Sequence, residues 1–188
     1  MRARPHFNTA DMELKEIKQQ FYAFRNGIVA DALRKAGDGH QVIFGLNLPQ
    51  LIQVAQTAGC DRALAEQLWA NATTRESRLL APMVYPRADF AESTAVEWVR
   101  GVENTEVADV LCHKLLRYED YAERLYIALC GSESDMTRYV ALRLALNLSI
   151  QGRIADVGAL HAAAVEEQGR DCPLTAHLAA SILEDFGD

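Results

Sequence analysis

Asp109 is the residue whose type and position most strongly suggest chemistry. It lies in VEWVRGVENTEVADVLCHKLLR, near the end of a run of short segments, residues 61–117, with the pattern of capped helices. An ionised carboxylate in a fixed position can stabilise positive charge that develops during a reaction. A buried carboxylate also needs a charged partner, because an unpaired buried charge is costly. Asp109 is therefore a candidate catalytic group, or one half of an ion pair between two helices, with Arg138 as a candidate partner.

Cys112 and His113 are neighbours on the same expected helix, but they do not form a nucleophile and base pair. Adjacent helical residues point about 100° apart, so the two side chains do not face one target. The four cysteines are 52, 18 and 42 residues apart, with no CxxC and no histidine at zinc-finger spacing. We expect reduced, mostly buried thiols and no metal. No P-loop, Rossmann or triad pattern occurs, so no cofactor is expected.

The elements that must position Asp109 are helices. Residues 11–24 carry apolar side chains at i, i+3 and i+4 spacing, which predicts a helix with one buried face. Further helices are predicted over residues 28–36, ending at Gly37; from Pro49 to Ala58, ending at Gly59; and from Asp61 to Trp69. In all, about eleven helical segments are expected, and no segment rich in strand-forming residues interrupts them, so the predicted fold class is all-α.

Three helix starts are predicted from pairs of residues that resemble capping boxes. These pairs are Thr73 with Glu76, Asp89 with Glu92, and Ser132 with Asp135. The last pair introduces residues 134–151, in which leucines alternate with other residues as in a strand. We predict a helix there, because the segment is longer than an ordinary strand and its start signal is helical. Apolar side chains on all sides suit a helix between two neighbours.

Several polar and aromatic residues are expected to have structural roles only. Glu76 is assigned to a helix cap and Arg78 to a contact between helices, while Trp69 and Trp98 occupy apolar helical positions and are predicted core residues. Repeated helix-turn-helix units, each too small to bury its own apolar face, predict stacking into a solenoid.

Composition is that of one helical domain outside membranes. A chain of 188 residues with 49% apolar content can bury a shared core, so we expect a single domain over residues 1–188, with 1–10 flexible. The formal charge of -7 lowers the expectation of strong non-specific DNA binding, although a few arginines can dominate one groove. The N-terminal segment lacks a secretory apolar stretch and no run is long enough to span a bilayer, which predicts a cytoplasmic protein.

The order and spacing of several segments resemble the DNA alkylation repair family, the AlkD-type alkylpurine DNA glycosylases built from HEAT-like repeats. The matching segments are IFGLNLPQL, LAEQLWA, TRESRLLA, VEWV and EVADVLCHKLL. The resemblance implies an α–α superhelix, a HEAT-like or ARM-type solenoid of stacked antiparallel helix pairs. It covers most of the chain and is weaker before residue 40 and after residue 151.

The same resemblance implies a site at Asp109, with departures from the family pattern. Asp109 matches the catalytic aspartate and Arg138 matches an arginine of the family's site. Thr105 and Ser181 stand where the family has tryptophans that hold the damaged base. Glu184 stands where the family has another arginine. Each lost aromatic face removes a cation–π contact of roughly 0.5–2 kcal/mol with a cationic base. The resemblance therefore implies a nucleic-acid site at Thr105, Arg138 and Ser181 without its aromatic parts.

Three functions remain open at this point. The chain is a divergent DNA-binding member without catalysis, a protein-interaction scaffold that holds a protein or peptide in a concave groove, or an active glycosylase with an altered pocket. Basic residues spread through the helices are either a shared DNA-facing side or an ordinary solvated surface interleaved with acids. They are Arg25, Arg34, Lys35, Arg75, Arg78, Lys114, Arg117, Arg138 and Arg143.

Overall fold

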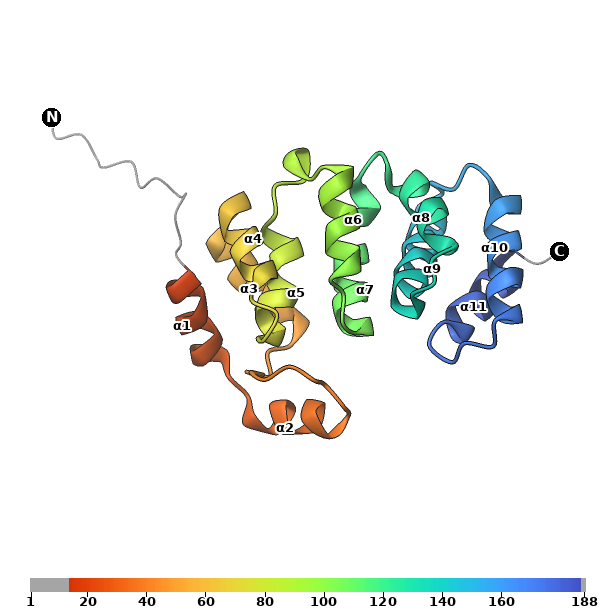
Figure 1. Ribbon diagram of the computed structural model, residues 1–188. Coiled ribbons are helices and arrows are strands. Elements are labelled where there is room, and N and C mark those ends of the chain that lie inside the picture. Colours follow the sequence, from red (N-terminus) through yellow and green to blue (C-terminus); the bar gives the residue numbers. More distant parts are fainter. Residues whose placement is uncertain (1–13, 187–188) are drawn as a thin grey trace, which may run out of the picture. The chain divides into compact units, whose positions relative to one another are not determined.

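The computed structural model describes residues 14–186, and in this range the regular elements are helices joined by loops (Figure 1). It contains eleven α-helices and two short 3-10 helices, and the only extended pairing in this range is an isolated bridge between Val42 and Thr74. The predicted all-α class is therefore confirmed, with helices packed in neighbouring pairs as in a helical solenoid. Contacts divide the chain into two compact units that meet at Asp89 and Phe90. The single domain stays a prediction, and the expected flexible residues 1–10 lie outside the described range.

The first unit contains five helices, and α5 is the one on which two of the others pack. Helices α3 and α4 both pack on α5, and α1 packs on α3 and α4 (Figure 1). Its core includes Ile17 and Phe21 from α1 and Leu68 from α4, all with no exposed surface. The helices are α1 (Leu14–Phe24), α2 (Gly27–Lys35), α3 (Leu48–Ala58), α4 (Arg62–Ala70) and α5 (Arg75–Val84), followed by the 3-10 helix η1 (Arg87–Asp89).

The loop between α2 and α3 is fixed at Gly45, where two backbone segments approach each other closely. Gly45 has a φ of +81°, and a Cβ there would lie 2.3 Å from the carbonyl oxygen of Asn26 and 2.9 Å from the amide nitrogen of Ala30. Only glycine fits such an approach without displacing backbone. Asn26 is also the N-cap of α2, so this contact sets the position of α2.

The second unit is organised around α9. Helices α7 and α8 pack on α9, α10 packs on α11, and α11 also contacts α9. The elements are α6 (Glu92–Arg100), α7 (Thr105–Lys114), the 3-10 helix η2 (Leu116–Tyr118), α8 (Ala122–Cys130), α9 (Asp135–Ile150), α10 (Val157–Gly169) and α11 (Ala176–Phe186). The helix predicted over residues 134–151 is thus confirmed, and buried residues lie on all its sides because neighbours cover most of it.

The helix starts differ in detail from the three predicted capping pairs. Helix α5 begins after Thr74, α6 begins after Ala91 without a side-chain cap, and α9 begins after Ser134, whose hydroxyl accepts from the Thr137 amide at 3.3 Å. A capping box is found instead at α3, where Asn47 and Gln50 each accept from the other's backbone amide, at 3.0 and 2.9 Å. The predicted pairs were wrong because a cap is decided by the local backbone turn, which residue types alone do not fix.

Both tryptophans are core residues, as predicted. Trp69 is 8% exposed and Trp98 is 5% exposed, and Trp98 meets the Phe90 ring edge-on with 5.2 Å between ring centres. The Arg78 guanidinium covers the Trp69 ring at 3.7 Å. Across residues 14–186 no helix combines the length and apolar character needed to cross a membrane.

Candidate functional site

Asp109 is positioned by the first two turns of α7. The helix starts at Asn104, whose side-chain oxygen accepts from the Val107 amide at 2.9 Å and so fixes the first turn. Thr105 and Asp109 are four residues apart and share one face of the helix. Val107 and Leu111 bury the opposite side of the helix. Asp109 is therefore held near the middle of a well-anchored helix, with its side chain 43% exposed.

Two residues of α9 meet the Asp109 carboxylate. The Tyr139 hydroxyl donates to Asp109 Oδ1 at 3.0 Å, and Arg143 Nε lies 2.7 Å from the same oxygen. Arg143 Nη2 also donates to the Tyr139 hydroxyl at 3.3 Å, which closes a ring of three side chains. Tyr139 and Arg143 are four residues apart, so one face of α9 presents both. Tyr139 is only 2% exposed, whereas the Arg143 side chain is 28% exposed.

Helix α11 adds a third part to this group. The His177 ring lies against the Tyr139 ring, with 6.0 Å between ring centres and planes tilted by 47°. Ser181 is one turn further along α11, and its hydroxyl donates to the His177 carbonyl at 3.0 Å. We refer to Asp109, Tyr139, Arg143 and His177 as the Asp109 cluster. Ser181 is not a member of the cluster, because its hydroxyl donates to a carbonyl of its own helix.

Burial and charge determine how these groups ionise. Burial raises the pKa of Tyr139; Arg143 opposes that rise and Asp109 adds to it. Burial alone lowers the pKa of Arg143, but its bond to Tyr139 and the charge of Asp109 outweigh this and raise it. Cys112, fully buried on α7, has a strongly raised pKa because of burial and the nearby Asp109 charge. The Cys112 thiol is therefore not a nucleophile at neutral pH.

Arg138 does not belong to the Asp109 cluster, which corrects the pairing considered from the sequence. Its guanidinium donates from Nε to both carboxylate oxygens of Glu167, at 3.1 and 2.9 Å, and from Nη2 to Asp135 at 2.7 Å. Nη1 donates to the carbonyl of Ser132 at 2.8 Å. Glu167 also accepts from the Thr175 hydroxyl at 2.6 Å. Arg138 is 4% exposed and ties α9, α10 and the loop before α9 together.

Comparison with known proteins gives one family match. A profile described as "DNA alkylation repair enzyme" matches residues 17–169, which is more than half of the chain. The chain belongs to the DNA alkylation repair enzyme family. No match was found among curated proteins or among solved structures.

In this DNA alkylation repair family member, two further arginines also prove to be internal. Arg75 and Arg78 are 4% and 3% exposed. Arg75 Nη1 donates to Glu76 at 2.9 Å and to the Leu46 carbonyl at 3.1 Å, and Arg78 Nη1 donates to the Trp69 carbonyl at 2.7 Å. Like Arg138, these two arginines bond protein partners and expose almost no surface.

Glu76 is also not a helix cap. Its carboxylate accepts from the amides of Phe44, Gly45 and Leu46 at 3.0, 2.9 and 3.3 Å, and it has no exposed surface. The negative charge is satisfied by these three amides and by Arg75. Glu76 thus fixes the loop before α3 instead of starting α5.

Three members of the Asp109 cluster were missed as site residues in the sequence. Tyr139 was not considered, and Arg143 was grouped with the dispersed basic residues. The available signal was the spacing of Tyr139 and Arg143, which places an aromatic hydroxyl and a cation on one helical face. His177 had no signal in sequence, because only the packing of α11 on α9 brings it to Tyr139. Among the described residues, no group of three or more His, Cys, Asp or Glu side chains could hold a metal ion.

Proposed function

We propose that this protein is a DNA-alkylation-repair-like protein that binds DNA without excising alkylated bases. The observation that carries the proposal is that the Asp109 carboxylate already contacts two side chains of the protein. One carboxylate oxygen holds both the Tyr139 hydroxyl and the Arg143 guanidinium, at 3.0 and 2.7 Å. A carboxylate contributes to excision by stabilising the positive charge that develops on the sugar. A cation 2.7 Å away offsets that negative charge before any substrate arrives.

The surroundings of Asp109 support the same conclusion. Thr105 and Ser181, which occupy the two positions matched to tryptophans, have no ring that could lie against a cationic base. The aromatic ring that does contact the cluster belongs to Tyr139, which is 2% exposed and faces its protein neighbours. His177 contributes an exposed imidazole, which is a smaller ring than an indole. A nucleotide would therefore enter this region without an indole face to hold it in register.

A second candidate, a protein-interaction scaffold, is favoured by the charge of the second unit. Residues 90–188 contain eight Lys and Arg against seventeen Asp and Glu, a formal charge of -9. Such a surface attracts a basic protein or peptide and repels a polyanion. The first unit, with eleven Lys and Arg against nine Asp and Glu, carries a formal charge of +2. DNA binding by this chain therefore depends on the first unit.

Salt-dependent binding to DNA separates the two candidates. The measurement is the anisotropy of a fluorescein-labelled 20-nucleotide oligomer, single-stranded and as a duplex, titrated with the protein between 25 and 200 mM salt. We expect saturable binding in which the logarithm of the association constant falls linearly with the logarithm of the salt concentration, because each neutralised phosphate releases counterions. Absence of binding at the lowest salt excludes the DNA-binding proposal and leaves the scaffold.

A further inference from the structure

We propose that one face of α1 is a binding surface for single-stranded nucleic acid, with Tyr22 as a stacking platform between cations. This proposal rests on the proposed DNA-binding function and names the surface that performs it, away from the Asp109 cluster. Its basis is the order of side chains along α1 and at the residue that follows it. Lys15, Lys18, Tyr22 and Arg25 follow one another at steps of three, four and three residues.

These steps place Lys15, Lys18 and Tyr22 on one stripe of α1, where at 100° per residue they fall within an arc of roughly 60°. Arg25 is the first residue after α1, and its amide donates to the Tyr22 carbonyl at 3.4 Å, so it follows directly after that stripe. Ile17 and Phe21, which have no exposed surface, lie on the side that packs into the first unit. We call Lys15, Lys18, Tyr22 and Arg25 the α1 stripe. Lys15 and Arg25 are exposed and Lys18 is half-buried.

Tyr22 has the exposure and the support that a stacking residue needs. Its side chain is 58% exposed, unusual for a large aromatic residue in this structure. The Phe44 ring meets it edge-on, with 4.9 Å between ring centres and a 78° angle between planes. Phe44 also contacts the buried Phe21 ring at 5.6 Å, so the Tyr22 ring is braced from the core. A braced, exposed ring loses little freedom when a flat base stacks on it.

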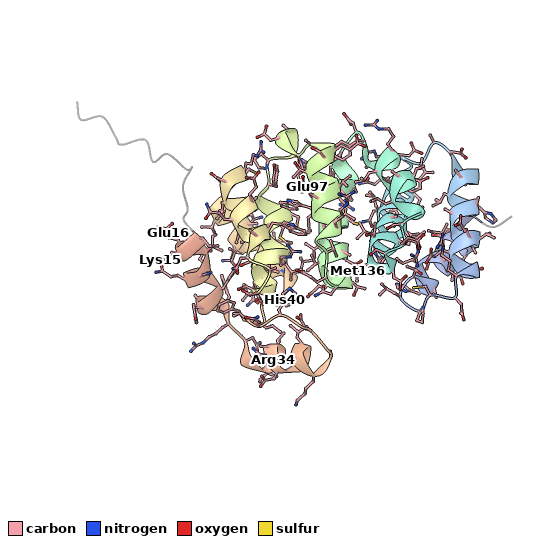
Figure 2. All side chains as sticks on the ribbon, viewed as in Figure 1. Lys15, Glu16, Arg34, His40, Glu97 and Met136 are labelled. Atoms are coloured by element: carbon pink, nitrogen blue, oxygen red, sulfur yellow. The ribbon has the colours of Figure 1, made fainter. Side chains whose placement is uncertain are left out.

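The charges of the α1 stripe are available to an anion. The described residues show no ion pair at Lys15, Lys18 or Arg25, whereas Arg34 on α2 pairs with Asp31 at 3.2 Å. Glu16 is the acid nearest in sequence, and it points about 100° away from Lys15; both are labelled on α1 in Figure 2. The stripe is thus a row of cations interrupted by one aromatic ring. A single-stranded nucleic acid has the matching order, because its phosphates alternate with unpaired bases. Each phosphate carries a negative charge for a cation, and each base has a flat face that can stack on Tyr22.

The test compares two triple variants of equal charge. The stripe variant is Lys15→Gln/Lys18→Gln/Arg25→Gln, and the control is Arg62→Gln/Arg100→Gln/Arg124→Gln, which removes three exposed cations from α4, α6 and α8. The probe is a fluorescein-labelled single-stranded 20-mer. We expect the stripe variant to bind at least about tenfold more weakly, with the slope of log affinity against log salt reduced by about 2, since each phosphate contact on a single strand contributes about 0.7. The control should bind as the unmodified protein does.

Tyr22→Ala isolates the stacking contact. We expect about tenfold weaker binding to the single strand with an unchanged salt slope, because one stacked base is lost and no charge is removed. Circular dichroism checks that each variant is folded. If the unmodified protein binds and the stripe variant binds equally well, this inference is wrong while the DNA-binding proposal stands. If the unmodified protein binds neither single-stranded nor duplex oligomer, both fail.

Discussion

Helix α9 carries two arginines five residues apart, and the two are used in different ways. Arg138 is 4% exposed and bonded to Glu167, Asp135 and a loop carbonyl, whereas Arg143 is 28% exposed at its side chain and meets a half-exposed carboxylate, Asp109. Arg138 bonds the buried Glu167 and two loop carbonyls, and its one exposed partner is Asp135. The difference shows that burial, more than the presence of an ion pair, separates a structural arginine from one that a ligand could reach.

The largest expected effect comes from breaking the buried pair. Glu167→Ala leaves the Arg138 charge inside the protein without its main partner, and such a loss typically costs 3–5 kcal/mol of unfolding free energy, so we expect about 3 kcal/mol or more. The measurement is urea unfolding followed by circular dichroism. Glu166→Ala is the matched control, because Glu166 is 68% exposed at its side chain and pairs with Arg170 on the surface. If both variants lose less than about 1 kcal/mol of unfolding free energy, the buried pair is not a structural tie and the contrast between Arg138 and Arg143 fails.

Alkaline pH should produce the next largest effect, through a thiol beside the buried network. Burial, with Glu167 and Glu166 nearby, raises the pKa of Cys130 from 9.0 to about 11. Between pH 9 and pH 11 the Cys130 thiol is ionised in the unfolded chain but stays protonated in the folded protein. The unfolding free energy that this thiol contributes is therefore fully present below pH 9 and is lost as the pH rises towards 11. Each pH unit removes up to about 1.4 kcal/mol.

Urea unfolding at pH 8, 9, 10 and 11 measures this dependence. Cys130→Ala should show a shallower decline than the unmodified protein over the same interval. The variant Cys60→Ala serves as the control, because Cys60 is the exposed cysteine and its removal should leave the decline unchanged. An identical decline in the Cys130 variant would show that this thiol is not held protonated by the fold.

The smallest effect on stability is expected at the Asp109 cluster. Asp109→Asn removes the charge facing Arg143 but keeps an oxygen that can accept from Tyr139, and both charged groups are solvated in part. We expect the unfolding free energy to fall by about 1 kcal/mol or less. Tyr139→Phe, which deletes the buried hydroxyl, provides the comparison in the same unfolding experiment. A cost at Asp109 as large as that of Glu167→Ala would mean that the cluster is a buried structural tie.

The sequence was sufficient for the fold and for the existence of an Asp109 ion pair, but not for its partner. Helix 134–151 could be predicted despite alternating leucines because its length exceeds that of a strand. The choice between Arg138 and Arg143 could not be made, because five residues on a helix turn the side chain by about 140° and sequence does not show which direction faces α7. Likewise, Glu76 has the spacing of a capping residue, and only the returning loop at Gly45 reveals its three amide partners.

Release of alkylated bases tests the central claim most directly. Duplex DNA carrying N7-methylguanine and N3-methyladenine is incubated at low salt with enough protein to bind all of it, and the free bases are quantified by chromatography. The unmodified protein and Asp109→Asn are compared under identical conditions. We predict that DNA is bound and that base release by the unmodified protein does not exceed release by the variant. Release that depends on Asp109 would contradict this account and show that the carboxylate, despite Arg143, still acts on a base.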